Sequence, residues 1–297
     1  MAAGTAVFDS AQRRTMVIKV VTDSTCDLPD SVLEEKGIAM VPATVVYKGR
    51  AYRDRVDISC DRIFEMLRAG GEVPTTAAPP PAHFSQVYGQ FAGDGDGIIS
   101  LHVTSEHSGI FDSALRGSEN VGKACKICVV DTRQVSMGIG LLALDAAEAA
   151  AQGASLDEIM ALVRRNIPRV RIFGAFDTMR YLALGGRINR ALGNVGTVLK
   201  IRPLLTAKSG WIVRAGLART YAGAIDRVVS MTLEAGEIEE WSVVYSTDRD
   251  VADEVAARLG RVCPPGRVPV ARLGPALGIH GGPGAILVAA KLSRSGL

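Results

Sequence analysis

Short runs of β-branched and other apolar residues alternate along the first half of the chain with segments of helical periodicity. The runs that predict strands lie at residues 17–22, 40–47, 97–103 and 126–130. Helical patterns separate them at 27–37, 58–69, 82–92, 110–121 and 134–152. Asp27 is expected to cap the first of these helices, which ends at Gly37. Alternating strands and helices predict an α/β fold whose parallel sheet has helices on both faces.

The pattern breaks at residues 164–168, where the sequence reads Arg-Arg-Asn-Ile-Pro. A second α/β unit follows, with expected strands at 172–177, 199–207, 211–217 and 241–246 and two more at the end of the chain. Helices are expected at 179–184, 222–234 and 251–260. We therefore expect a disordered extension over residues 1–15, a first domain over 16–165 and a second domain over 166–297.

Composition narrows the class of protein. The chain has 297 residues, of which 47% are hydrophobic and 22% charged, an ordinary balance for a globular protein with a large core. Its formal net charge is +3 and it contains no block of five Lys or Arg residues, so nucleic-acid binding is not indicated. No apolar run reaches the about 18 residues that a membrane span requires, and no transmembrane segment is expected.

Five scattered cysteines favour reduced thiols and a cytoplasmic location. The apolar stretch after Arg13-Arg14 is too short and too charged for an export signal. Cys125-x-x-Cys128 has no second pair beside it, so core thiols are favoured over zinc ligands. The four histidines also lack metal-ligand spacing, and no metal or cofactor is expected.

The loop after the third strand, residues 104–109, reads Thr-Ser-Glu-His-Ser-Gly. Ligands of open parallel sheets bind at the carboxyl ends of strands, where this loop lies. Its hydroxyls and glycine suit a small anion cradle, and equally suit the cap of the following helix. A second polar loop, residues 73–79, places Thr75 and Thr76 between prolines, either as ligand contacts or within a stiff connector.

The two enzymatic alternatives are a serine hydrolase and a kinase-type subunit. A small-ester serine hydrolase of the α/β type would use Ser108, but the neighbouring His107 is poorly placed to act as its base, and the G-x-S-x-G elbow is missing. A kinase-type subunit would need a phosphate-binding loop, and no G-x-x-x-x-G-K-[ST] is present. Gly138-x-Gly140-x-x-Ala143 lies within helical periodicity, which indicates close helix packing in place of a dinucleotide site.

Six strings in order resemble the DegV family of bacterial fatty-acid-binding proteins, from about residue 17 to residue 292. They are VVTDSTCDLP at 20–29, PTTAAP at 74–79, TSEHSG at 104–109, DT at 131–132, YLALGGRI at 181–188 and GIHGGPG at 278–284. The resemblance implies a two-domain α/β protein that binds one long-chain fatty acid, such as palmitate, in a buried pocket, without covalent chemistry of its own.

The resemblance also implies roles for particular residues. The carboxylate is expected at Thr76 and Ser108, with Thr75 as the alternative to Thr76. Ser105 and Gly109 belong to the same head-group loop. Some relatives present the bound acid to a separate fatty acid kinase, and Arg219 and His280 stand at positions similar to an arginine and a histidine implicated in that step. From its glycine-dense surroundings alone, a packed loop residue is a slightly favoured interpretation of His280 over a functional residue.

Two departures from the family pattern affect the expected head-group site. Ala77-Ala78 replaces a Ser-Gln pair and so removes two polar side chains. His107 stands where the family usually has leucine. Both departures bear on ligand identity more than on the fold.

Overall fold

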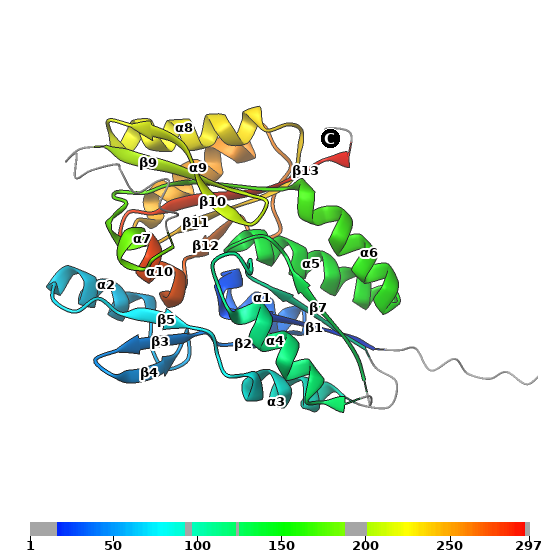
Figure 1. Ribbon diagram of the computed structural model, residues 1–297. Helices are drawn as coiled ribbons and strands as arrows, with labels where there is room; N and C mark the ends of the chain where they lie inside the picture. Colours follow the sequence, from blue (N-terminus) through cyan, green and yellow to red (C-terminus); the bar gives the residue numbers. More distant parts are fainter. Residues whose placement is uncertain (1–16, 93–96, 123–124, 188–200, 295–297) are drawn as a thin grey trace, which may run out of the picture.

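The computed structural model describes residues 17–92, 97–122, 125–187 and 201–294, which build three sheets and their helices (Figure 1). The layers run from one pair of helices, through a four-stranded sheet, to a second pair of helices, then a six-stranded sheet, and finally a third pair of helices. The four- and three-stranded sheets come from residues 18–131, and the six-stranded sheet from residues 170–292. The domain division at 165/166 stays a prediction, and the expected extension at 1–15 lies outside the described residues.

The four-stranded sheet is parallel and has the order β2-β1-β6-β7. Its elements are β1 (Ile18–Asp23), β2 (Ile38–Val41), β6 (Gly97–His102), β7 (Lys126–Asp131), and the helices α3 (Pro81–Phe91), α4 (Ile110–Glu119), α5 (Met137–Ala151) and α6 (Leu156–Asn166). All six residues of β6 are buried, as expected for a central strand with helices on both faces. The predicted α/β class, with its parallel sheet and flanking helices, is confirmed.

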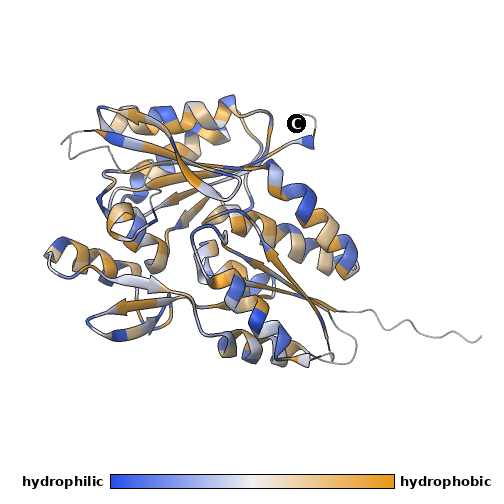
Figure 2. Ribbon diagram, in the orientation of Figure 1, coloured by the Kyte–Doolittle hydropathy of each residue, from blue (hydrophilic) through white to orange (hydrophobic). Residues whose placement is uncertain are grey.

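The six-stranded sheet has the order β10-β9-β8-β13-β11-β12 and is antiparallel except between β11 and β12. Its elements are β8 (Val170–Ala175), β9 (Arg202–Lys208), β10 (Trp211–Ala218), β11 (Ile238–Tyr245), β12 (Val270–Arg272), β13 (Ile286–Leu292), and the covering helices α8 (Tyr221–Glu234) and α9 (Arg249–Gly260). Figure 2 shows hydrophobic residues along the strands of both large sheets.

Helix α5 lies between the two large sheets and packs against β1 and β6 on one side and β8 and β13 on the other. Residues 137–147 of this helix are all buried. A helix that is covered all round needs no polar stripe, which explains its Ala- and Leu-rich sequence. A Cβ on Gly140 would lie 3.0 Å from the Cys26 carbonyl oxygen, so the glycine serves close packing as predicted.

A small antiparallel sheet, β4-β3-β5, lies beside the layers and carries the proline loop. The elements of this corner are β3 (Thr44–Tyr47), β4 (Arg50–Arg53), β5 (Thr75–Ala77), α2 (Cys60–Ala69), α7 (Arg180–Leu184) and α10 (Pro275–Gly281). Helix α10 packs against α2, α7 and β5, and thus joins this sheet to the C-terminal half of the chain.

Three local predictions are wrong. Residues 40–47 do not form one strand: Pro42 separates β2 from β3, which belong to different sheets. Asp27 does not cap a helix. It follows a short 3-10 helix, η1 (Ser24–Cys26), with a left-handed φ of 56°, and α1 (Asp30–Glu35) begins three residues later. The glycine-dense segment at 278–284 is partly helical, because it contains the second half of α10.

Two further features complete the fold. A 3-10 helix, η3 (Ile167–Arg169), leads from α6 into β8 at the point where the sequence pattern breaks. Within the described ranges, no helix is both long enough and apolar enough to cross a bilayer.

Candidate functional site

A cavity of about 1050 Å³, counting its open mouth, lies where the four-stranded sheet, the small sheet and the six-stranded sheet converge. One wall is apolar and comes largely from the six-stranded sheet and the residues beside it; it includes Ile172, Phe176, Leu205, Ile212 and Leu287. The polar groups come mainly from strand β5, from loops and from helix α10. An apolar wall with a few converging polar groups is the usual composition of a small-molecule site.

Thr76 and His280 meet at this cavity from positions 204 residues apart in the sequence. Thr76 Oγ1 lies 2.8 Å from His280 Nε2, and both residues line the cavity. Successive residues of a strand point to opposite faces, and in β5 this leaves Thr75 exposed while Thr76 is half-buried. Of the two threonines, the structure therefore brings Thr76, and not Thr75, to the cavity.

His280 is held as a neutral imidazole. Its side chain is only 8% exposed, and burial together with the nearby Arg187 guanidinium lowers its pKa to about 4. When Nε2 carries the proton it donates to Thr76 Oγ1, and the Thr76 hydroxyl hydrogen is then available to an acceptor in the cavity. Gly185 packs against the other edge of the ring, since a Cβ there would lie 2.1 Å from His280 Nδ1.

The loop after β6 brings Ser108 and Gly109 to the same cavity. The Ile110 backbone N–H donates to Ser108 Oγ over 3.3 Å, a long bond at the start of α4, so both the capping and the ligand-binding interpretations of this loop stay open. Ser105 lies apart from the cavity and donates to Asp131 Oδ2 at 2.6 Å. The loop thus brings Ser108 to the cavity, while Ser105 holds the loop to β7.

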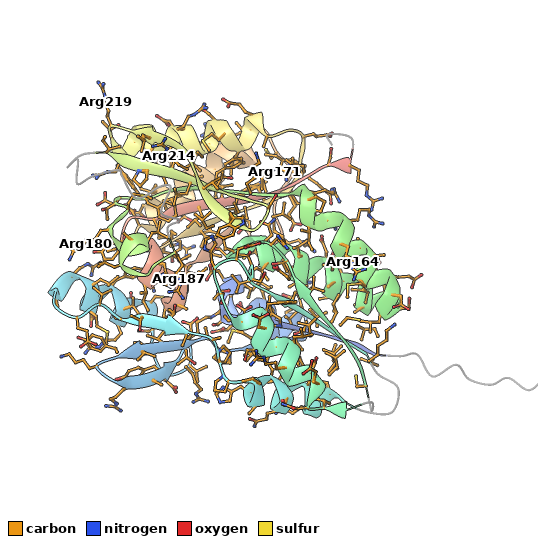
Figure 3. All side chains as sticks on the ribbon, viewed as in Figure 1. Arg164, Arg171, Arg180, Arg187, Arg214 and Arg219 are labelled. Atoms are coloured by element: carbon orange, nitrogen blue, oxygen red, sulfur yellow. The ribbon has the colours of Figure 1, made fainter. Side chains whose placement is uncertain are left out.

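An arginine that the sequence did not single out lines the cavity. Arg187 is half-buried, and its burial lowers the pKa of the guanidinium. Figure 3 shows Arg187 at the junction of the layers and Arg219 at the outer end of β10. Arg219 is exposed and does not line the cavity. The glycines before Arg187 in the string YLALGGRI were the available signal, because glycines allow close backbone approach.

Among the described residues of the cavity, no base faces Ser108 as a serine hydrolase would require. His107 Nε2 accepts from the Ile212 backbone N–H at 2.9 Å instead of facing Ser108. A Ser–His–Asp chain does exist elsewhere: Ser100 Oγ lies 2.7 Å from His102 Nε2, and His102 Nδ1 lies 3.0 Å from Asp23 Oδ2. All three side chains are fully buried and none lines the cavity, so this chain of bonds stabilises the parallel sheet.

Metal ligands do not cluster among the described residues, which contain no group of three or more His, Cys, Asp or Glu side chains arranged to hold a metal ion. Among the described residues, the polar side chains that line the cavity are hydroxyls, the imidazoles of His107 and His280 and the Arg187 guanidinium, a set that suits an anion better than a cation.

The chain is similar to known proteins over nearly its whole length. Residues 17–291 match the family model described as "Uncharacterised protein, DegV family". The chain is 32% identical over 271 residues to the DegV domain-containing protein of Caldanaerobacter subterraneus subsp. tengcongensis, across 90% of this chain and 96% of that protein.

Two solved structures are also similar to the chain. A DegV family protein from Thermus thermophilus, described by its fatty acid binding, superposes with a TM-score of 0.85 at 31% identity and covers 93% of this chain and 100% of its own. DegV of Bacillus subtilis, described as a fatty acid binding protein, gives a TM-score of 0.84 at 27% identity over 94% and 100% of the two chains. The family match and the shared fold agree over nearly the whole length, and the chain belongs to the DegV family.

Proposed function

We propose that this protein binds one long-chain fatty acid, such as palmitate, in the cavity. The observation that carries the proposal is the pairing of an apolar wall from the six-stranded sheet with Thr76, His280, Ser108 and Arg187 on the remaining sides. The carboxylate would lie at the hydroxyls of Thr76 and Ser108, and the acyl chain along Ile172, Leu205 and their neighbours. The fatty-acid-binding descriptions of the Thermus thermophilus and Bacillus subtilis proteins support the same ligand class.

The energetics favour such a ligand. Each buried methylene contributes about 0.8 kcal/mol, so about fourteen of them give roughly 11 kcal/mol before the loss of freedom on association. That loss is at least about 4 kcal/mol, so the tail alone leaves at most about 7 kcal/mol, which corresponds to a Kd near 10 μM or weaker. The polar groups therefore orient the carboxylate, and the apolar wall supplies most of the binding energy.

The charge state of the polar end suits a carboxylate. His280 is neutral and acts through its bond to Thr76, whereas Arg187 keeps its positive charge even though burial lowers its pKa. A half-buried guanidinium attracts an anion more strongly than an exposed one, because water screens it less. Arg187 thus offsets the loss of the polar Ser-Gln pair at Ala77-Ala78.

Lipid analysis of the purified protein tests the proposal. Denaturing extraction followed by mass spectrometry should recover a saturated or mono-unsaturated long-chain acid at close to one per chain. Protein stripped of lipid should take up added palmitate to the same stoichiometry. Protein that is isolated empty and ignores both palmitate and oleate would contradict the proposal.

We also propose that the bound acid is transported within the cytoplasm or presented to a separate fatty acid kinase. The family resemblance and the five scattered cysteines support these two points. A carboxylate that accepts a phosphoryl group needs cationic or donor groups around the developing charge. His280 lines the cavity, which supports a contact with the ligand, and Arg219 is exposed at the end of β10, which supports a contact with a partner.

A kinase assay tests the role of Arg219. With a kinase that phosphorylates the bound acid, Arg219→Ala should lower acyl-phosphate formation and leave palmitate affinity unchanged. An unchanged reaction rate would remove Arg219 from the proposal.

A further inference from the structure

The β9–β10 hairpin lies at the edge of the six-stranded sheet and forms part of the cavity wall. Strand β10 is the last strand of the sheet order, so only β9 pairs with it among the described strands. The two-residue turn between them has Ser209 at φ 51° and Gly210 at φ 89°, the positive angles of a tight hairpin turn. Whatever holds this end of the hairpin must therefore come from outside the sheet.

The contacts that hold it come from the loops after β6 and β7. Thr104 Oγ1 donates to the Gly210 carbonyl at 3.0 Å, and Arg133 donates to the Ser209 carbonyl at 3.3 Å. A Cβ on Gly210 would lie 2.6 Å from Thr104 Oγ1, so the turn fits tightly against that loop. The third contact is the 2.9 Å bond from the Ile212 N–H to His107 Nε2.

The wall is only one strand thick at this point. Ile212 lines the cavity, while the adjacent Trp211 is 40% exposed and packs edge-on against the His107 ring at 5.3 Å. His107 lines the cavity too, from the opposite side of the contact. Parting His107 from Ile212 would therefore join the cavity to the exterior beside Trp211.

The contact requires His107 to be unprotonated at Nε2, because an imidazolium has no acceptor. Burial lowers its pKa from the ordinary 6.5, Glu106 from the same loop opposes this, and Arg187 near α7 adds to the lowering. Glu106 is itself paired with Arg133, and the hairpin faces His107 with the uncharged Trp211 ring. The bond is fully present above about pH 6.5 and weakens as the pH falls toward the lower folded value.

We propose that the β9–β10 turn is a gate of the fatty-acid cavity, latched by the His107–Ile212 bond and released when His107 is protonated. The inference rests on the proposed function for the identity of the ligand, while the latch itself is a property of the protein without ligand. It gives a role to His107, which differs from the leucine usual in the family. Bound acid would leave faster in mildly acidic surroundings.

Release kinetics test the gate. Protein loaded with tritiated palmitate is mixed with excess phosphatidylcholine vesicles at a series of pH values from 7.5 downward. Once His107 is protonated, losing one neutral hydrogen bond predicts release about two- to tenfold faster for the wild type. His107→Gln keeps an acceptor that does not titrate and should release at one rate, apart from changes shared by all variants. His107→Leu should release fast across the series.

Matched variants and a second readout decide between explanations. Thr104→Val removes a different latch contact and should speed release while keeping the pH response. Equal acid acceleration in wild type and His107→Gln, or slow release from His107→Leu at pH 7.5, would overturn the proposal. In lipid-free protein, acrylamide quenching of the half-exposed Trp211 should rise at the acid end of the series only when His107 is present. Failure of palmitate to load would refute the ligand, whereas unchanged quenching would refute the latch.

Discussion

The two halves of the molecule meet at the cavity through separate hydrogen bonds, such as Thr76–His280 and His107–Ile212, and, farther along α5, through a buried network of charges. Asp145 lies nine residues after the cavity-lining Ser136, about 13 Å along the helix axis. Its carboxylate contacts Lys291 Nζ at 2.6 Å and Arg267 at 2.7 Å. Glu240 of β11 contacts the same two cations, at 3.2 and 2.5 Å.

The contrast between the cavity side and the charge network indicates where the protein can open. Lys291 is 4% exposed and Asp145 8% exposed, so separating them would leave charges uncompensated in the interior. Burial opposes the charge of Lys291, but Asp145 and Glu240 outweigh it and hold its pKa above the usual value. The hydrogen bonds of Thr76 and His107 each contribute far less free energy, and water or ligand can replace either partner. We infer that the network fixes the layers while the cavity side admits and releases the ligand.

The largest effect is expected from breaking the network. Lys291→Met leaves Asp145 and Glu240 short of a cation and should lower the free energy of unfolding by about 3–5 kcal/mol. Lys126→Met is the matched control, because Lys126 pairs with Asp157 on the exposed surface. That control should change stability by less than about 1 kcal/mol. Urea unfolding measures both, and equal losses would contradict the contrast.

His280 should contribute to the pH dependence of stability. His280 binds a proton more weakly when folded, with a pKa of about 4 against the ordinary 6.5. Its contribution is complete above pH 6.5 and is lost as the pH falls toward 4. Between pH 7 and pH 4 the wild type should lose roughly 3 kcal/mol more unfolding free energy than His280→Gln. Parallel pH profiles would mean that His280 is not held neutral.

Ligand affinity should respond to the cavity hydroxyls. Ser108→Ala and Thr76→Ala each remove a hydrogen bond to the carboxylate, and a bond to a charged group is worth about 1.5–3 kcal/mol. Palmitate affinity, measured by titration calorimetry, should fall about ten- to a hundredfold. Thr75→Ala is the control, since the exposed Thr75 should leave affinity unchanged. Wild-type binding by both cavity variants would place the carboxylate elsewhere.

The smallest effect is expected at the two arginines. Arg187→Gln should weaken palmitate binding about tenfold, because it removes a half-buried charge beside the carboxylate. Arg219→Gln should bind palmitate as the wild type does. High salt should narrow the gap between Arg187→Gln and wild type only slightly, since buried pairs are weakly screened. A loss of affinity in Arg219→Gln would move the head group toward the end of β10.

The sequence predicted those parts of the structure that depend on local pattern. Apolar runs such as that of β6 and the helical periodicity of α3 and α4 identify their elements, because burial on one or both faces leaves a period. It failed at Pro42, where one continuous apolar run serves two sheets. It also failed at α10, where Gly278 is required by the nearby ring of Phe64 and lowers local helix propensity.

The candidate site was predicted in part. Thr76 and Ser108 line the cavity as the family resemblance implied, and His280 is both a packed residue and a cavity residue. The role of each in binding stays a prediction. Arg187 was missed because its proximity to His280 is set by the packing of α7 on α10, which no local pattern reports. The contact of His107 with Ile212 likewise joins the loop after β6 to strand β10 of the six-stranded sheet.

A crystal structure with 16-bromopalmitate tests the central claim most directly, because the bromine marks the tail and the carboxylate marks the head. The account predicts one molecule per chain in the cavity, with carboxylate oxygens at hydrogen-bond distance from Thr76 Oγ1 and Ser108 Oγ. The bromine should lie among side chains of the apolar wall such as Leu205 and Leu287. A ligand bound in the reverse direction, or outside the cavity, would contradict the account.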